Sequence, residues 1–420
     1  MLFRSIWLSV YGSFANPNIV SPDSQTGLTS NTINSLVAGN IRSTGLGSDT
    51  ASSGPRTFST TGPTGNIVRV RSSGDVQIGT LSTAGHAILA ADNGSITSGA
   101  IVGTGGVGIF TRNNATLGNV TTSGALWLGN SSQYFLVVPT YQISNFPFSQ
   151  TPTGGSATLG MVRAGIIRGS ARDNISFTSL NATGDILLST GNSNTVGGNI
   201  SGGDVVAGST ITLTAGQSTM VGNVSAAGAT LLVGSQGAVS AANVVSTNGI
   251  VELSGGAGAA FNMILALSDV RVSGGAGQVT GGNISSTTGS VAGSGTGIDL
   301  ANLTAAGDVL ITSGTLARLG NVTGGGAASL TALNGNVQVA AVSAGDVDIS
   351  ATTGIVAGNV TALSGNVTLL TSNGDVLAGQ ITAHDDFTLN SAGKATLAGA
   401  SAGDDKIGRA SCRERVLMPV

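Results

Sequence analysis

The sequence predicts an all-β fold, a right-handed parallel β-helix (β-solenoid) with coils of about 19–20 residues. Three observations predict it: the composition, a marker residue that recurs at nearly constant spacing, and the alternation of apolar residues within each period. The 420 residues include 67 Gly, 40% are hydrophobic and 8% are charged, whereas ordinary globular proteins carry about 25% charged residues. Small β-branched residues between regularly placed Gly, Asn and Ser are typical of many short strands joined by tight turns.

A small polar residue that precedes an apolar one recurs along the chain. In the C-terminal half these markers return about every 20 residues, at Asn223, Asn243, Asn262, Asn283, Asn302, Asn321, Ala341, Asn359, Gln380 and Ala400. Upstream, spacings of 20 and 19 separate Thr80, Ala100 and Asn119. The longer interval from Asn199 to Asn223 predicts one enlarged coil. A fixed period of this length indicates a solenoid.

Each period has the same internal order. An apolar residue follows the marker, and a Gly-Asp or Gly-Asn turn follows shortly afterwards, as at Gly307-Asp308. Next comes an alternating apolar pair such as Val309 and Ile311, and then a looser third apolar site such as Ile355. Alternation at period two places these side chains on one face of a strand. Asn, Asp and Gly suit the corners. We therefore expect three short strands in each coil.

Three short strands cannot bury their apolar faces alone, but stacked coils can. Each strand then pairs in parallel with its equivalent one coil away, at about 4.8 Å. Equivalent positions form interior columns of Val, Ile and Leu, and Asn can form a ladder at a corner. The ten markers from Asn223 to Ala400 imply nine steps from one coil to the next, which add up to a solenoid length of roughly 43 Å. The right hand follows from the handedness of crossovers between parallel strands.

We expect six segments: 1–5 as an artefact, 6–65 as an irregular N-terminal segment, 66–130 and 156–405 as solenoid coils, 131–155 as an aromatic and Pro-rich insertion loop, and 406–420 as an artefact tail. Residues 406–416 read KIGRASCRERV, which resembles translated sequencing-adapter DNA, and residues 1–5 resemble the opposite adapter. The only cysteine, Cys412, lies in this tail. We interpret the chain as a cysteine-free fragment of a longer protein, which suits export through a bacterial envelope.

The insertion at 131–155 contains five of the fifteen aromatic residues, namely Tyr134, Phe135, Tyr141, Phe146 and Phe148. Solenoids often carry binding elements on such insertions, so these five residues are the candidate ligand contacts. The alternative is that they pack over the side of the solenoid or cap an open edge.

Titratable residues recur at one corner of the repeat and therefore indicate turns. Glu252, the one Glu outside the tail, lies between Val251 and Leu253 and should face solvent. The recurring turn position is occupied by Asp75, Asp185, Asp308, Asp346 and Asp375. Acid–base catalysis needs paired titratable groups in a shaped site. We predict no catalytic residue and no enzyme.

The two histidines are expected to be turn residues. His384-Asp385-Asp386 could be read as a metal or acid–base cluster, but Asp386 takes the corner position before the inward Phe387. Adjacent residues on a strand point to opposite faces. His86 follows Gly85 in the same corner position and should be solvated.

No cofactor or metal is predicted. The runs 255–258 and 274–277 begin like the calcium-binding repeat GGxGxDxUx but lack its Asp, and Cys and His are too rare for zinc. A net charge of −3 without a clustered basic face argues against nucleic-acid binding. No apolar run is as long as the roughly 18 residues that indicate a membrane-spanning helix, so we expect none in this fragment.

Tandem coils of the form GNVTaxGDVxLxxxxG resemble the repeats of filamentous-haemagglutinin-like exoproteins, over roughly residues 66–130 and 156–405. These are large bacterial surface adhesins, many of them exported by two-partner secretion, and autotransporter passengers share the pattern. The resemblance implies an extracellular or cell-surface location and an outer-membrane transporter as export partner. It also implies a structural or adhesive rod that binds host, cell or matrix surfaces through a glycan or protein ligand. Residues 16–19, Asn-Pro-Asn-Ile, resemble the family's Asn-Pro-Asn-Gly signature but lack the Gly, and we interpret them as coincidence.

Two other functions stay open. A parallel β-helix polysaccharide lyase or glycosidase would line a groove with Asp, Lys and Arg, for which the chain offers Lys394 and scattered Arg such as Arg163, Arg168 and Arg172. An ice-binding solenoid would need flat outward Thr rows. In this chain one position of the repeat is occupied by Thr or Ser, at Thr304, Thr323, Ser343, Thr361 and Thr382, but these residues are not part of TxT pairs.

Overall fold

Parallel strands stacked coil upon coil make up the computed structural model, which is a β-solenoid as predicted. The structure describes residues 74–83, 86–91, 93–129, 155–192 and 195–403, together with the backbone path of five strands between residues 5 and 72. No helix occurs in these ranges, and none of their segments is a helix able to cross a membrane. The chain divides into two units, Met1–Val221 and Gly222–Val420. The right hand of the winding stays a prediction.

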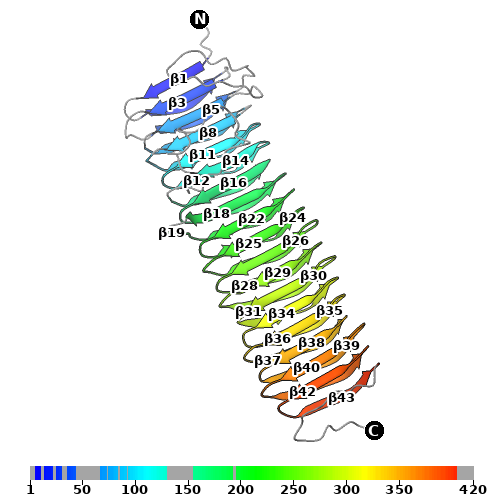
Figure 1. The fold of residues 1–420 in the computed structure, drawn as a ribbon. Coiled ribbons are helices and arrows are strands. Elements are labelled where there is room, and N and C mark those ends of the chain that lie inside the picture. The colour runs from blue at the N-terminus through cyan, green and yellow to red at the C-terminus, as the bar shows by residue number, and fades with distance from the viewer. Residues whose placement is uncertain are drawn as a thin grey trace. The chain divides into compact units, whose positions relative to one another are not determined.

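In the first unit the strands alternate between two sheets (Figure 1). Sheet A contains β1 (Ser5–Val10), β3 (Gln25–Ser30), β5 (Ile67–Ser72), β8 (His86–Ala91), β11 (Val107–Thr111), β14 (Ala125–Gly129), β16 (Ile166–Ala171), β18 (Ile186–Asn192), β19 (Thr195–Val196) and β22 (Ile211–Ala215). Sheet B contains β2 (Phe14–Ser21), β4 (Leu36–Ser43), β6 (Val76–Ile78), β7 (Leu81–Thr83), β9 (Ile96–Ser98), β10 (Ile101–Gly103), β12 (Ala115–Leu117), β13 (Val120–Thr122), β15 (Ala157–Ala164), β17 (Ile175–Ala182), β20 (Ile200–Gly202), β21 (Val205–Ala207) and β23 (Thr219–Met220).

The second unit repeats the same two-sheet arrangement. Its sheet A strands are β25 (Thr230–Gly234), β27 (Val251–Gly255), β29 (Val270–Ser273), β31 (Val291–Gly295), β34 (Val309–Ser313), β36 (Ala328–Ala332), β38 (Val347–Ala351), β40 (Val367–Thr371) and β42 (Phe387–Ser391). Its sheet B strands are β24 (Val224–Ala226), β26 (Val239–Ser246), β28 (Ala259–Ala266), β30 (Gln278–Ser286), β32 (Gly297–Leu300), β33 (Leu303–Ala305), β35 (Ala317–Gly324), β37 (Asn336–Ala344), β39 (Gly354–Ala362), β41 (Asp375–Ala383) and β43 (Ala395–Ala402).

The register of the second unit confirms the predicted period. One column of paired residues runs through nine rises, in the order Val224, Val244, Ile264, Ile284, Leu303, Val322, Val342, Val360, Ile381 and Ala400. Two predicted markers were wrong by one residue. The marker of one coil is Met263 rather than Asn262. The sequence pattern missed it because this methionine points outward although it is apolar. The marker of the last coil is Gly399 rather than Ala400.

Each coil has three strand segments, but two of them share a sheet. In β35, residues 317–319 pair with β32 and residues 322–324 pair with β33, which are separate strands of the preceding coil. The inward positions of β35 are Ala317, Leu319, Val322 and Gly324, so the alternation slips by one residue at Gly320. The chain therefore bends within sheet B, and one sheet presents two apolar segments to the interior.

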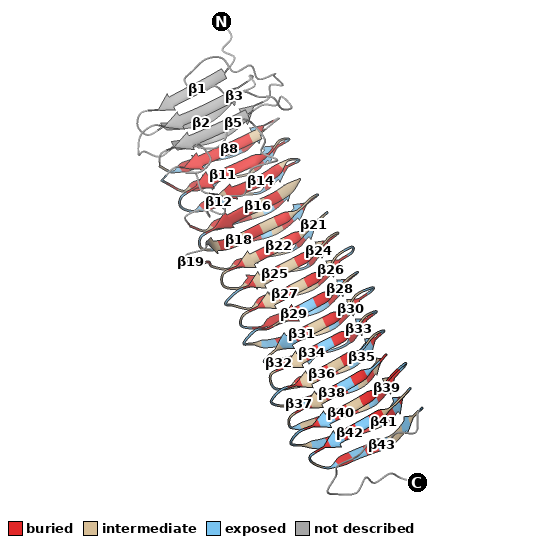
Figure 2. Cartoon of the chain, viewed as in Figure 1, coloured by how far each residue is buried: buried red, intermediate tan, exposed pale blue. Residues whose placement is uncertain are grey.

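The interior consists of columns of aliphatic side chains. One column on sheet A of the second unit contains Leu232, Leu253, Val272, Gly293, Ile311, Leu330, Ile349, Leu369 and Leu389. All of these residues are buried, while the residues between them on each strand are half-buried or exposed (Figure 2). Burying one such side chain contributes about 1.5–3 kcal/mol, so stacking supplies the stabilisation that a lone coil lacks.

Two phenylalanines in these columns are each followed by a glycine one coil later. Phe177 pairs with Gly202, and Phe261 pairs with Gly281. A Cβ at Gly202 would lie 2.2 Å from the Phe177 ring, and a Cβ at Gly281 would lie 2.4 Å from the Phe261 ring. Each ring therefore occupies the space that a side chain on the glycine would fill.

Among the described residues, two inward positions, Ser98 and Thr230, carry a hydroxyl oxygen without a hydrogen-bond partner. Thr230 is fully buried in the column that Val251 continues, and its Oγ1 has no partner among the described residues. An unpaired buried hydroxyl costs about 1–3 kcal/mol. Thr230→Val, which keeps the shape, should raise the free energy of unfolding by about 1 kcal/mol, as measured by chemical denaturation. Ser246→Ala is the contrast: the Ser246 hydroxyl donates to the Gly228 carbonyl at 2.6 Å, so its removal should destabilise.

Three coils of the first unit are longer than the others, and in the first of them Gln25 on β3 pairs with Ile67 on β5, an advance of 42 residues. From Asn174 to Asn199 the chain advances 25 residues per coil, because β18 and β19 form an antiparallel hairpin at a corner. The enlarged coil thus precedes Asn199 rather than following it. The prediction was misplaced because Asn199 and Asn223 occupy different positions of the repeat: Asn199 precedes β20, and Asn223 precedes β24, which pairs with β21. From Asn114 to Ser156 the advance is 42 residues, and residues 130–154 of this stretch are not among the described residues.

The strands between residues 5 and 43 follow the same parallel register as the coils. Asn18 and Ile19 on β2 pair with Asn40 and Ile41 on β4. The Asn-Pro-Asn-Ile sequence thus occupies an ordinary position of the repeat, although we expected the segment 6–65 to be irregular.

Candidate functional site

The acidic corner residues accept backbone hydrogen bonds from the next coil. Asp308 Oδ1 accepts the Ala327 N–H at 2.8 Å, and Asp346 Oδ1 accepts the Asn366 N–H at 2.8 Å. The same contact joins Asp75 to Ser95, Asp185 to Thr210, Asp269 to Ser290, and Asp375 to Lys394. Asp185, Asp269, Asp308 and Asp346 precede sheet A strands, whereas Asp75 and Asp375 stand where sheet B strands begin, so the single turn position predicted for them is in fact two corners. At both corners the carboxylate satisfies an N–H group of the next coil. Their recurrence is explained by turn formation, as the sequence indicated.

The predicted asparagine ladder runs along the second corner, within sheet B. Asn243 Nδ2 donates to Asn223 Oδ1 at 2.8 Å, and Asn302 Nδ2 donates to Asn283 Oδ1 at 2.9 Å. Elsewhere on the ladder the amide oxygen accepts a main-chain N–H of the next coil, from Asn321 to Asn302 and from Gln380 to Asn359, both at 3.1 Å. Each amide side chain therefore links one coil to the next.

His86 performs the same structural role. Its Nδ1 accepts the Gly106 N–H at 2.8 Å, as an aspartate oxygen does at the other corners. The side chain is half-buried rather than solvated as we expected, and burial lowers its pKa below the usual 6.5. Because Nδ1 must be unprotonated to accept this hydrogen bond, the folded state favours neutral imidazole.

The lowered pKa of His86 predicts a pH dependence of stability. The unfolded chain binds a proton on this residue near pH 6.5, whereas the folded chain binds it only at lower pH. The stabilisation is therefore fully present above pH 6.5 and is lost as the pH falls through 6.5 towards the lower folded pKa. Unfolding curves at successive pH values on either side of 6.5 should show a steeper loss for the wild type than for His86→Asn, whose side-chain oxygen accepts the bond at every pH. Parallel curves would contradict this role.

The His384 cluster does not assemble a metal site. His384 Nδ1 lies 2.8 Å from Asp385 Oδ1, and both side chains are substantially exposed. Asp386 belongs to the corner ladder, where its N–H donates to Asn366 Oδ1 at 2.9 Å. Among the residues that the structure describes, no group of three or more His, Cys, Asp or Glu side chains could hold a metal ion.

The glycine runs that resemble calcium repeats form turns. Gly275 has φ of 53°, in the left-handed region that favours glycine. The Gly277 N–H donates to the Gly274 carbonyl at 2.8 Å and closes this turn.

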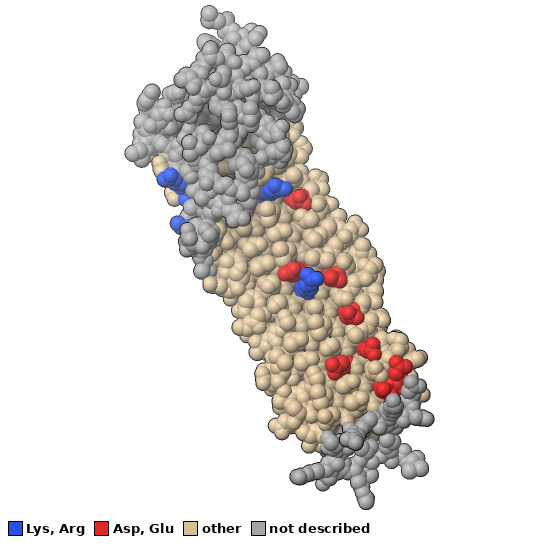
Figure 3. Space-filling model, viewed as in Figure 1, with Lys and Arg blue, Asp and Glu red and all other residues tan. Residues whose placement is uncertain are grey.

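The arginines considered for a polysaccharide-binding groove lie on different surfaces. Arg163 is on β15 of sheet B, while Arg168 is on β16 of sheet A, 3.8 Å from Asp185. Arg172 forms a two-bonded ion pair with the adjacent Asp173, at 2.9 and 3.0 Å, which lowers the pKa of that carboxyl. On the face shown in Figure 3, charged side chains are sparse on a mostly uncharged surface.

Hydroxyl side chains form two continuous rows on the outer faces of the second unit. The sheet B row contains Ser285, Thr304, Thr323, Ser343, Thr361, Thr382 and Ser401. The sheet A row contains Ser254, Ser273, Ser294, Thr312, Thr331 and Ser350. All are half-buried or exposed, and the Thr331 and Ser350 hydroxyls lie 3.1 Å apart. The sequence revealed part of the first row, whereas the second became evident only from the register.

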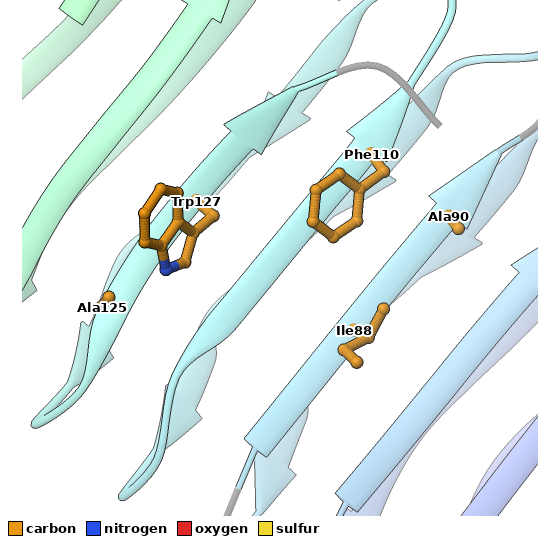
Figure 4. Close-up of a cluster of buried hydrophobic side chains, with 5 residues drawn as sticks. All are labelled: Ile88, Ala90, Phe110, Ala125 and Trp127. Atoms are coloured by element: carbon orange, nitrogen blue, oxygen red, sulfur yellow. The ribbon is translucent and has the colours of Figure 1, made fainter. Parts of the chain in front are cut away.

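One outer face of the first unit is apolar instead. Ile88, Ala90, Phe110, Ala125 and Trp127, which we call the outer patch, occupy outward positions on β8, β11 and β14 and form a buried cluster (Figure 4). Sequence reasoning missed it, although the strands HAILAA, VGIFT and ALWLG lack the usual apolar–polar alternation. The five predicted ligand-contact residues, Tyr134, Phe135, Tyr141, Phe146 and Phe148, lie outside the described residues.

Comparison of the chain with protein-family models, with curated proteins and with solved structures gave no match.

Proposed function

We propose that the chain is a structural and adhesive part of a large exported bacterial surface protein, which binds host, cell or matrix surfaces through loops and repeated coil faces. The observation that carries the proposal is the pair of hydroxyl rows, in which the same polar group recurs once per coil over six and seven coils. A repeated row offers a ligand many equivalent weak contacts. Such contacts add through multivalency.

The corner ladders support the structural half of the proposal. Each Asp or Asn side chain at a corner connects two coils, as Asp346 connects its own coil to the N–H of Asn366. Stacked coils contact only their neighbours, so every added coil contributes the same set of bonds and extends the surface. The extracellular location and the outer-membrane transporter as export partner follow from the resemblance of the repeats to filamentous-haemagglutinin-like exoproteins and belong to the proposal.

Binding of the full chain to a panel of immobilised matrix proteins, surface glycans and cultured cells tests the adhesive function. For any surface that retains the chain, replacing Thr304, Thr323 and Thr361 with Glu one after another should weaken binding stepwise. The matched control introduces Glu at Ser329, Thr368 and Thr388 in the same way. These residues point outward from sheet A but lie outside both hydroxyl rows. Retention on no surface, or equal losses in both series, would contradict the proposal.

Ice binding is a second candidate, because the same rows place hydroxyl groups at one-coil intervals on a β-sheet face. The sheet A row has Ser or Thr at six successive coils, and the sheet B row has Ser or Thr at seven. Thermal hysteresis of the purified chain, with and without Thr312→Glu and Thr331→Glu, decides this candidate. A freezing-point depression equal to that of a colligative control would eliminate it. In the same preparation, incubation with acidic polysaccharides tests the lyase alternative through release of unsaturated ends.

A further inference from the structure

Asn-Gly dipeptides occur at four corners of the chain, and they begin at Asn93, Asn248, Asn334 and Asn373. All four asparagines are exposed and stand between consecutive strands. In such a dipeptide the main-chain nitrogen of the glycine can reach the side-chain amide carbon of the asparagine, because glycine has no Cβ to obstruct the approach. The dipeptide is identical at the four corners, so the hydrogen bonds around each one distinguish them.

The stacking of the coils explains why glycine follows asparagine at these corners. A Cβ at Gly249 would lie 2.6 Å from the main-chain nitrogen of Ala229, and a Cβ at Gly335 would lie 2.4 Å from the carbonyl oxygen of Thr315. Both contacts are with the backbone of the preceding coil, which cannot give way as the end of a side chain can. The spacing of the coils therefore requires glycine, and glycine makes the preceding asparagine reactive.

The next coil holds the dipeptide that begins at Asn93. Asn93 Oδ1 accepts a hydrogen bond from Arg112 Nη1 at 3.2 Å, and the Asn93 main-chain carbonyl accepts one from Asn113 Nδ2 at 3.1 Å. The Gly94 carbonyl accepts the Asn113 N–H at 3.3 Å. The side-chain amide must turn towards the glycine nitrogen in order to react, and these bonds oppose that rotation.

The dipeptide that begins at Asn373 is held through its glycine. The Gly374 carbonyl accepts hydrogen bonds from the hydroxyl groups of Thr371 at 2.7 Å and Ser391 at 3.0 Å. It also accepts the Gly393 N–H at 3.0 Å. The Gly374 peptide group therefore cannot rotate without breaking three bonds.

The dipeptides that begin at Asn248 and Asn334 are held much less. Among the described residues, neither asparagine side chain has a hydrogen-bond partner, and the N–H groups of Gly249 and Gly335 have none either. The carbonyl of each glycine accepts a single main-chain N–H of the next coil, at 3.2 and 3.1 Å respectively. Both reacting groups are thus exposed and unbonded at these two corners.

We propose that Asn248 and Asn334 are sites of spontaneous deamidation. The nitrogen of the following glycine bonds to the asparagine Cγ, and the side-chain amino group leaves as ammonia together with the proton from the glycine nitrogen. The product is a cyclic succinimide. Water then opens the ring at either carbonyl and yields aspartate or isoaspartate, so that water is the only other reactant.

Deamidation changes the corner in two ways. It converts a neutral amide into a carboxylate, which adds negative charge to a chain whose net charge is already −3. The isoaspartate product also lengthens the main chain by a methylene group, next to the glycine carbonyl that binds the next coil. The coil should therefore open locally more often at these corners. This chemistry does not depend on the proposed adhesive function.

Timed peptide mapping of the purified full chain, held at neutral and at mildly alkaline pH, tests the proposal. Peptides that contain Asn248 and Asn334 should gain the mass of an acid in place of an amide, and should do so several-fold faster than those with Asn93 and Asn373. The rates should rise with pH, because the attacking nitrogen must lose its proton. Equal rates at the four sites, or faster reaction at Asn93 or Asn373, would overturn the proposal.

The same measurement in denaturant separates structure from sequence. The four rates should converge in the unfolded chain, where the hydrogen bonds of the corners are absent. If the order of the rates persisted there, the neighbouring residues in the sequence would set it, and the structural explanation would fail.

Two variants test the protection directly in the folded chain. Arg112→Ala removes the hydrogen bond to Asn93 Oδ1 and should accelerate deamidation of Asn93 several-fold. Thr371→Val keeps the shape of the side chain but removes a hydrogen bond to the Gly374 carbonyl, and should accelerate deamidation of Asn373. The rate at Asn334 is the internal control and should stay constant in both. Unchanged rates at Asn93 and Asn373 would show that these hydrogen bonds do not decide which corner reacts.

Discussion

Gly281→Ala should lower the free energy of unfolding by about 1–3 kcal/mol, because the new methyl group collides with a buried ring. The Cβ would lie 2.4 Å from both Cε2 and Cζ of Phe261, which is itself only 6% exposed. The ring cannot move inward, since the neighbouring columns are closely packed. Chemical denaturation of the purified chain measures the effect.

Two further variants separate this collision from a general effect of losing glycine. Gly297→Ala adds the same methyl group where the nearest atom is 3.4 Å away, on the Gln278 side chain, and should be nearly neutral. Phe261→Leu combined with Gly281→Ala moves volume from one coil to the next and should be less destabilising than the sum of the single changes. Additive losses would show that the two residues do not share one space.

Removal of one complete coil should leave the fold intact, whereas removal of half a coil should disrupt it. Deleting residues 327–345 joins Gly326 to Asp346 and removes β36, which pairs with β34 on one side and with β38 on the other. In the shortened chain β38 can take the place of β36 and pair directly with β34 in the same register. The Asp346 N–H then takes the place of the Ala327 N–H opposite Asp308 Oδ1. Circular dichroism and a cooperative unfolding curve close to that of the parent are the expected result.

The matched control deletes residues 327–335 instead. This deletion removes β36 but keeps β37, so that β34 and β38 lose their shared partner in sheet A, and the coil can no longer close. We expect loss of the cooperative transition and aggregation. If both deletions behaved alike, the coils would not be interchangeable units, and the description of the interior as columns would fail.

Local patterns were sufficient to predict the fold class and the period. The short sequence around Asn321 recurs around Asn302 and Asn359. The alternation that places Val309 and Ile311 two residues apart identifies the inward face of their strand from the local sequence alone. The assignment failed where an apolar residue points outward, as at Met263, because the pattern treats every apolar residue as interior. It also failed at the hairpin of β18 and β19, where inserted residues shift the phase without changing the composition.

Surface features were the least predictable. The hydroxyl row from Ser254 to Ser350 depends on which residues meet between coils, and such partners are a whole coil apart in the chain. The outer patch was missed because Phe110 and Trp127 look like ordinary strand residues until the direction of each side chain is known. His86 could not be distinguished from a solvated turn residue, since its acceptor role requires the Gly106 N–H of the next coil.

The sequence by itself therefore determined that this chain winds in parallel coils of about 19–20 residues around aliphatic columns, with Asp and Asn at the corners. Those properties are local, because alternation and turn chemistry act over short stretches of the chain. Tertiary structure alone decided that two segments of each coil share one sheet, that Phe261 packs over Gly281, and that one outer face is apolar and buried. These properties depend on contacts between coils, whose register is set only when the whole stack closes on its core.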